Sequence, residues 1–292
     1  MNGFSEREPT VIFIYFMAVS GVAMFCAAPS MLLLSLLGAI ALFSLTARRG
    51  RAKAHLTMLL LLLIAGLINP LFSHKGDTVL FFINDTPITL ESILYGFTAS
   101  LMLVTVLYWF RSFSVIMTED RLLHVFGRLS PRLALVLSMA LRYVPLFGAR
   151  MRETEQSQKG LGLYGDGNPI DTVRSAARVF SITTTWALEK GIITASSMDA
   201  RGYGLNTRSF YKRYRFRLKD GILLSLILLA LAGTVTGIAF GGADFDFYPQ
   251  FTAPKLGAAT LIAHISYGIL AFLPAILETE ERIRWKYLLS RI

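Results

Sequence analysis

Charged residues are scarce in this sequence. Only 16% of the 292 residues are charged and 54% are hydrophobic, whereas an average soluble domain carries about 25% charged residues. The apolar residues gather in several runs of roughly 18 or more, the length that crosses a bilayer as a helix. This composition excludes an ordinary soluble domain and predicts an all-α, polytopic membrane protein.

Residues that commonly carry catalysis or hold metals are few as well. The single cysteine, Cys26, excludes a disulfide framework, and its apolar surroundings indicate a small buried hydrophobe. The four histidines are isolated from one another, so no metal-ligand spacing occurs. The chain has no Gly-Lys dipeptide and therefore no Walker A loop. We predict no metal site, no cofactor and no enzymatic activity in this chain.

One glycine-rich stretch imitates a nucleotide-binding motif. In "GLGLYG", Gly160, Gly162 and Gly165 satisfy the pattern G-x-G-x-x-G. A dinucleotide site of this kind needs a strand before the glycines and a helix after them. The preceding "MRETEQSQK" is polar and favours a helix. We interpret the glycines as a helix stop followed by a turn.

Ionisable residues are nearly absent from the apolar runs. Glu91 and Asp220 lie at the ends of runs, and His264 is the one titratable residue well inside, where we expect a packed, hydrogen-bonded histidine. Proton- or ion-coupled transporters need intramembrane carboxylates or broken helices, so an independent secondary transporter is disfavoured. The predicted spans lie at about residues 11–28, 30–46, 55–72, 90–110, 220–240 and 256–277.

Basic residues are almost missing from one set of loops. With the N-terminus inside, 27 of the 29 Lys and Arg lie on the inner side, and only Lys75 and Lys255 lie outside. By the positive-inside rule, we predict a multi-pass protein of the cell membrane with both termini cytoplasmic. The predicted regions are an N-terminal membrane region (1–110), a cytoplasmic coupling region (111–219) and a C-terminal membrane region with a basic tail (220–292).

The segment "LALVLSMALRYVPLF", residues 133–147, leaves an alternative open. It is apolar enough for a seventh span, but it contains Arg142 and Pro145. An arginine at the centre of a spanning helix costs about 2.5–3.5 kcal/mol on insertion scales. We therefore expect a helix in the interface or buried under the spans, and a crossing remains the alternative.

The stretch "RSFYKRYRFRLKD", residues 208–220, mixes cations with aromatic residues. Such mixing can bind nucleic acid. Beside a predicted span it more often indicates cations and rings that lie at an anionic lipid surface. We therefore predict a lipid bilayer as the partner of this stretch, and no nucleic acid.

Two predicted helices in the coupling region end alike. The first begins after Ser130, with Pro131 at its first position, and ends at 159–160. The second begins near Pro169 and ends at 201–202. Each ends with a cation followed by glycine, which suits the helix dipole and the C-terminal cap. Arginine, with its planar fork of donors, is also suited to grip a partner's carboxylate.

The second of these helices carries small residues at spacings of three and four. Such spacing places them along one side of the helix, where another helix can approach closely. Packing within the chain is the simpler explanation and stays open. The stripe consists of Val173, Ala177, Phe180, Thr184, Ala187, Gly191, Ala195 and Met198.

Taken in order, these segments resemble the T component of energy-coupling factor (ECF) transporters. "NPLF", "GDTVLFFINDTPITLES", "LSMALRYVPLF" and the two basic helix ends follow one another as in that family. The family's second Ala-Arg-Gly motif matches Ala200, Arg201 and Gly202, followed by Tyr203. Its first motif, A-Q-x-x-R-G, corresponds to "EQSQKG": Gln156 and Gly160 match, Glu155 replaces Ala, and Lys159 stands for Arg.

The resemblance implies a non-catalytic coupling subunit. It implies two cytoplasmic ABC-type ATPases that dock at the motif residues, and a small substrate-binding membrane subunit for a vitamin or a transition-metal ion. The residue stripe from 173 to 198 is then the expected interface with that subunit. A membrane-embedded enzyme acting on lipids or isoprenoids, or an independent secondary transporter, remains the alternative.

Overall fold

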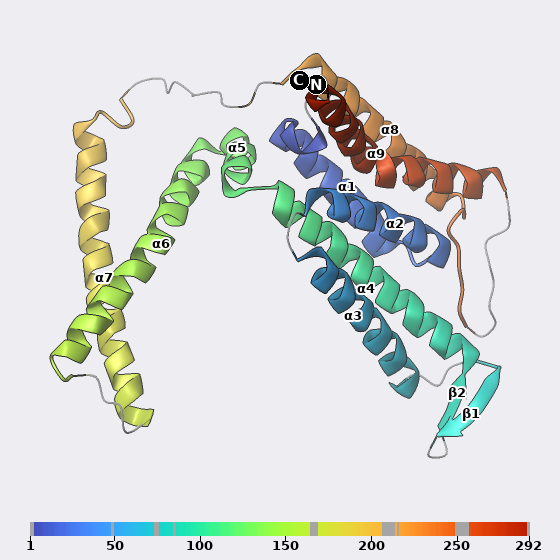
Figure 1. The fold of residues 1–292 in the computed structure, drawn as a ribbon, viewed down its shortest axis with the longest axis horizontal. Coiled ribbons are helices and arrows are strands. Elements are labelled where there is room, and N and C mark those ends of the chain that lie inside the picture. Colours follow the sequence, from blue (N-terminus) through green and yellow to red (C-terminus); the bar gives the residue numbers. More distant parts are fainter. Residues whose placement is uncertain are drawn as a thin grey trace. The chain divides into compact units, whose positions relative to one another are not determined.

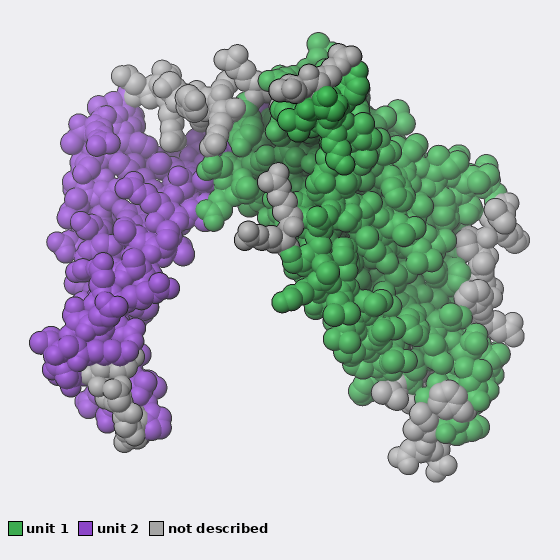
Figure 2. Space-filling view, in the orientation of Figure 1, with its two compact units in different colours: residues 1–122, 214–292 green, residues 123–213 purple. Residues whose placement is uncertain are grey.

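The structure is a computed structural model that describes residues 3–47, 50–72, 76–83, 86–163, 169–205, 214, 216–248 and 257–290. This described part contains nine α-helices, a short 3-10 helix and one two-stranded hairpin (Figure 1). The predicted all-α, polytopic fold is confirmed. The chain divides into two compact units, Met1–Leu122 with Tyr214–Ile292 and Leu123–Arg213 (Figure 2). Each unit is described by itself.

The first unit is a bundle of long apolar helices. Pro9 and Pro29 stand at the first positions of α1 and α2, where a missing backbone N–H has no cost. Thr89 caps α4, because its side chain accepts a hydrogen bond from the Ser92 backbone N–H at 3.3 Å. The elements are η1 (Phe4–Glu6), α1 (Pro9–Phe25), α2 (Pro29–Thr46), α3 (Arg51–Phe72), β1 (Val79–Ile83), β2 (Thr86–Thr89), α4 (Leu90–Ile116), α8 (Leu218–Ala239) and α9 (Ala258–Leu289). The boundary between the two units falls within α5 (Glu119–Leu129), after Leu122.

Six helices of the described part are long and apolar enough to cross a membrane, which makes this a multi-pass membrane protein. They are Pro29–Thr46, Arg51–Pro70, Leu90–Ile116, Pro131–Gly160, Leu218–Ala239 and Ala258–Leu289. The set differs from the six predicted spans, because the helix that contains 133–147 is included.

The first predicted span, 11–28, overlaps helix α1, which is not among these six helices. Helix α1 has 17 residues, fewer than the roughly 20 that cross a bilayer upright. It ends at Phe25 because the chain is extended at Cys26 and Ala28. The residue before a proline avoids helical angles, so Ala28 has to leave the helix before Pro29.

A buried hydrogen-bond network of polar side chains joins four helices of the first unit. Trp109 Nε1 and the Tyr267 hydroxyl both donate to Ser35 Oγ, at 2.9 and 2.7 Å. The Tyr15 hydroxyl donates to the Leu270 carbonyl at 3.1 Å. Unpaired donors at membrane depth cost several kcal/mol each, so these bonds make α1, α2, α4 and α9 interdependent.

His264 has the packed, hydrogen-bonded role expected of it. Its Nδ1 lies 2.8 Å from the Thr260 carbonyl, which can only accept, so Nδ1 carries the proton. Its Nε2 is hydrogen-bonded to the Ser30 hydroxyl at 2.8 Å. The histidine thereby connects the start of α2 to α9.

The N-terminal segment contacts both the start of α8 and the far part of α9. Arg7 Nη1 lies 3.4 Å from Asp220 Oδ1, and both side chains are largely buried. The Ser5 backbone N–H donates to Glu278 Oε2 at 3.4 Å. The start of the chain and the final stretch of α9 therefore lie at one end of the first unit.

Candidate functional site

The second unit is built on a pair of long antiparallel helices, α6 (Pro131–Gly160) and α7 (Pro169–Ala200) (Figure 1). With 30 and 32 residues, they are about 45 and 48 Å long. As predicted, Ser130 caps α6, because its side chain accepts from the Leu133 backbone N–H at 3.4 Å, and Pro131 follows at the first position.

Aromatic residues join the two helices near their middle. The rings of Tyr143 and Phe147 stack with centroids 5.6 Å apart, and Phe147 meets the Trp186 ring edge-on at 5.9 Å. The Arg150 guanidinium lies over Trp186, with 5.7 Å from Cζ to the ring centroid. The Tyr143 hydroxyl is hydrogen-bonded to Thr194 Oγ1 at 2.6 Å. These contacts form the aromatic joint between α6 and α7.

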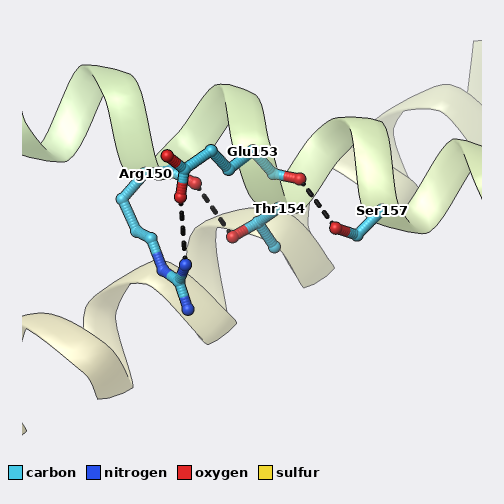
Figure 3. Close-up of polar contacts among 4 residues, drawn as sticks. All are labelled: Arg150, Glu153, Thr154 and Ser157. Atoms are coloured by element: carbon cyan, nitrogen blue, oxygen red, sulfur yellow. Dashed lines mark hydrogen bonds and ion pairs between the residues drawn. The ribbon is translucent and has the colours of Figure 1, made fainter.

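Polar residues on α6 beside this joint are hydrogen-bonded to one another (Figure 3). Arg150 Nη1 pairs with Glu153 Oε2 at 3.0 Å. The hydroxyls of Thr154 and Ser157 donate to the carbonyls of Arg150 and Glu153, each at 2.9 Å. Because Glu153 holds the Arg150 side chain, it also helps to keep the guanidinium over Trp186.

The first tip, residues 155–163, is the C-terminal end of α6 and the turn after it. Leu163 N–H donates to the Gln158 carbonyl and Gly162 N–H to the Lys159 carbonyl, each at 3.0 Å. Gly162 has φ +69°, a left-handed conformation that glycine adopts without strain. This pair of bonds around a left-handed glycine is the Schellman cap. Lys159 Nζ pairs with Glu155 Oε1 at 2.8 Å, one turn earlier.

The second tip, residues 198–205, ends α7 in the same manner. Tyr203 N–H donates to the Met198 carbonyl at 3.1 Å, and Gly202 N–H to the Asp199 carbonyl at 2.9 Å. Gly202 is left-handed, with φ +76°. Arg201 is exposed, and in the described ranges it forms no ion pair. The residue order Ala200, Arg201, Gly202 thus places a cation at the last position before the turn.

The glycine pattern in "GLGLYG" ends a helix, as interpreted from the sequence. Gly160 is the last residue of α6 and Gly162 forms the cap, while Gly165 lies outside the described residues. A helix precedes the glycines where a dinucleotide site would need a strand.

A hollow of about 500 Å³ lies beside the second tip. Its polar lining includes both Arg142 and Arg201, together with Tyr143 and Tyr203. Two arginines facing one hollow favour an anionic group, and a carboxylate suits their fork of donors. The remaining lining residues are Leu135, Met139, Ile193, Thr194, Ser197 and Met198.

The two tips lie at opposite ends of the helix pair. Arg201 shares its hollow with Met139 of the N-terminal half of α6, and Met139 lies about 30 Å along α6 from Lys159. At the other end, the Leu163 carbonyl accepts from Ser175 Oγ at 3.2 Å and from Arg178 Nη1 at 3.3 Å. The two basic helix ends, at Lys159 and Arg201, therefore lie at two separate places in the second unit.

The small-residue stripe lies mostly outside the contact between α6 and α7. Val173 and Phe180 are 69% and 62% exposed. The buried positions of α7 are instead Ser175, Val179 and Thr183. Exposed stripe residues are Val173, Ala177, Phe180, Thr184, Gly191 and Ala195, while Ala187 and Met198 are partly buried.

Sequence reasoning missed the aromatic joint and the second arginine of the hollow. Tyr143 and Phe147 are four residues apart, a spacing that indicates one helix face, but nothing in the sequence pairs that face with Trp186. In the sequence, Arg142 stands out only by the free-energy cost of inserting it in a membrane. Among the described residues, no group of three or more His, Cys, Asp or Glu is placed to hold a metal ion.

Known sequences resemble this chain over most of its length. The family model CbiQ, described as cobalt transport protein, matches residues 4–211. Three relatives carry the name energy-coupling factor transporter transmembrane protein EcfT. The protein from Streptococcus equi subsp. equi (strain 4047) is 29% identical over 33% of this chain and 37% of its own length. Those from Bacillus selenitireducens and Staphylococcus aureus (strain 04-02981) are 27% and 26% identical, over 42% and 59% of this chain. The matched stretch spans 48% and 69% of those two relatives.

Proposed function

The chain belongs to the CbiQ cobalt transport protein family, and on that premise we propose that it is the transmembrane coupling subunit of an energy-coupling factor importer. Two cytoplasmic ABC-type ATPases supply the energy, and a small membrane subunit captures a vitamin or a transition-metal ion. This chain is the non-catalytic connection between them. The names of the EcfT relatives support the assignment.

The observation that carries the proposal is the exposed Arg201 at a capped helix end. A cation without an ion pair in the described part, beside the two-arginine hollow, is ready to receive a partner's carboxylate. Two tips at opposite ends of one helix pair suit two ATPases, one at each end. The proposed docking residues are Gln156, Lys159, Gly160, Ala200, Arg201, Gly202 and Tyr203.

The exposed stripe on α7 is the proposed contact for the substrate-binding subunit. Small side chains let a partner helix come close and slide without large side-chain rearrangement. Val173 and Phe180 at one end of the stripe are exposed within the second unit. Motion of the ATPases at the tips is then passed along α6 and α7 to this face.

We place the protein in the cell membrane, with both termini and both tips on the cytoplasmic side. The contacts of Arg7 with Asp220 and of Ser5 with Glu278 support it, because they hold the start of the chain and the end of α9 on one side. The basic residues concentrated on that side agree with the positive-inside rule.

Purification from the native membrane tests the proposal. The wild-type chain should bring down two ATPase subunits and a small membrane protein. Arg201→Ala should insert normally but lose at least tenfold of the ATPase and of substrate uptake. Full uptake and unchanged ATPase recovery with this variant would contradict the proposal. Recovery of the wild-type chain alone would favour the enzyme or the independent transporter instead.

A further inference from the structure

We infer that Arg142 is a further docking residue, and that Arg142 and Arg201 together bind one acidic side chain of the ATPase at the second tip. The apolar walls of the hollow then receive the apolar residues beside that side chain. The inference rests on the proposed function, because it concerns the same ATPase at the same tip. It gives a role to a residue outside both basic helix ends, and it specifies the partner's surface as an aspartate or glutamate with apolar neighbours.

The two arginines come from different helices but line one hollow. Arg142 belongs to α6 and Arg201 follows the last residue of α7, and both line the hollow of about 500 Å³. Directly beside Arg142, the Tyr143 hydroxyl is hydrogen-bonded to Thr194 Oγ1 of α7 at 2.6 Å. The Tyr203 N–H donates back to a carbonyl of α7 at 3.1 Å and holds the turn that carries Arg201. The backbone positions of both cations are therefore fixed before a partner binds, which lowers the entropic cost of docking.

Neither arginine is compensated by a carboxylate in the part of the chain that the structure describes. The described residues that line the hollow include no aspartate or glutamate. Within the described ranges, the side chains of Arg142 and Arg201 form no ion pair and no hydrogen bond. The nearest acidic residues along α7, Glu189 and Asp199, are exposed and lie outside the lining. Two uncompensated cations that line one hollow repel each other, and an anion between them offsets that repulsion.

Arg142 is also the only charged residue in the apolar stretch 133–147. Charged side chains are costly in segments that are apolar enough to enter a membrane, and those that occur there usually serve a function. Arg142 is exposed, so packing within the second unit does not account for it. A partner that supplies the opposite charge accounts for both its presence and its exposure.

The lining of the hollow favours a protein side chain as the anion. The planar guanidinium group matches the two oxygens of a carboxylate. Strong binding points between proteins combine a charged or aromatic anchor with surrounding contacts that exclude water. The apolar walls that would supply such contacts come from Leu135, Met139, Ile193 and Met198. Because Arg201 belongs to the proposed docking turn, we assign the hollow to an acidic side chain of the ATPase.

Recovery of the ATPases with the intact chain, purified at about 0.1 and about 0.5 M NaCl, tests the inference. Arg142→Gln and Arg201→Gln should each lose about tenfold at the lower salt concentration, the effect of one hydrogen bond to a charged group. The double variant should lose no more than about threefold beyond either single variant, because loss of either arginine already leaves the shared carboxylate poorly bound. At the higher salt concentration, which screens the charge contact, Arg142→Gln should come within about threefold of wild type.

Arg132→Gln is the matched control. Arg132 is exposed on α6 near Leu135, but it does not line the hollow. Its replacement removes the same charge from the same helix and should retain the ATPases within about twofold of wild type. A loss as large as that of Arg142→Gln would mean that the overall charge of α6, rather than the hollow, attracts the ATPase, and it would overturn the inference.

The outcomes separate the inference from the proposed function. Full recovery with Arg142→Gln beside a loss with Arg201→Gln overturns the inference alone, whereas full recovery with Arg201→Gln overturns the proposed function. An undiminished loss with Arg142→Gln at the higher salt concentration assigns Arg142 a structural role, and a loss of about a hundredfold with the double variant assigns the arginines to separate groups. Either result overturns the inference. So does a loss with Arg142→Gln that occurs in nanodiscs containing phosphatidylglycerol but not in those of phosphatidylcholine alone, because the hollow would then bind a lipid headgroup.

Discussion

The guanidinium of Arg150 lies over the indole ring of Trp186, with 5.7 Å between Cζ and the ring centroid. This contact joins α6 to α7 halfway between the two tips. It belongs to a joint that also contains Phe147, so the relation between the tips depends on a small number of side chains near the middle of two long helices.

Replacing Trp186 with leucine should loosen the helix pair. The change removes the cation–π contact and the edge-on contact with Phe147, together worth about 1–2 kcal/mol. We expect a lower thermal midpoint in detergent and faster proteolysis within residues 131–200. Trp285→Leu, at a tryptophan that is 58% exposed on α9, is the control. Equal shifts for both variants would mean that the joint contributes nothing beyond the loss of a large side chain.

Replacing Ser35 with alanine should destabilise the first unit. The change leaves the buried donors of Trp109 and Tyr267 without their shared acceptor. Loss of a buried acceptor costs about 1–3 kcal/mol. The matched control is Ser225→Ala, because Ser225 is exposed and bonds only to the carbonyl of Ile222 on its own helix. A melting midpoint for Ser35→Ala equal to that of the control would mean that this buried hydrogen-bond network does not stabilise the first unit.

Replacing Gly237 with alanine should push α8 away from α9. A Cβ at this position would lie 2.8 Å from the Cα and the backbone nitrogen of Ala263. These are backbone atoms, which cannot rotate away as a flexible side chain can. Overpacking of this kind costs about 1–3 kcal/mol. At Gly21 an added Cβ meets nothing within 4 Å, so Gly21→Ala should be neutral or slightly stabilising. Thermal melting of the two variants side by side measures the difference, and equal stability would contradict the close approach.

Accessibility labelling should place the second tip on the cytoplasmic side. In a Cys26→Ala background, the exposed Leu205 is changed to cysteine and treated with a membrane-impermeant reagent on intact cells and on inverted vesicles. Labelling is expected only in inverted vesicles. Asp77→Cys, in a loop predicted to lie outside, should label only in intact cells. Reaction of Leu205→Cys from the outer side would remove the basis for ATPase docking.

The helix ends of the second unit could be predicted because they depend on local chemistry. The start of α6 is set by Ser130 and Pro131, and the ends of α6 and α7 are set by the glycines after Lys159 and Arg201. Each cap depends only on residues that are neighbours in the sequence. The register of those caps could not be predicted in the same manner. Gly160 and Gly162 are both competent to end α6, and the contacts of the Leu163 carbonyl with α7 accompany the later of the two.

Features that depend on pairing between helices were also beyond the sequence. The repeat of basic ends gave no sign that the tips lie at opposite ends, because that follows from how α6 and α7 pack. The stripe from Val173 to Met198 was identified by its spacing, but its exposure depends on which face α6 covers. Only the position of α6 against Ser175, Val179 and Thr183 decides it.

The antiparallel course of α6 and α7 determines what a force on this unit can do. Equal pushes in one direction at both tips would translate the pair as a whole. Pushes in opposite directions would exert a torque, and the centre of rotation would lie near Phe147 and Trp186. Rotation about that centre would turn a small angular change into a displacement of several ångströms at each tip, because the tips lie far from it at the two ends of the pair.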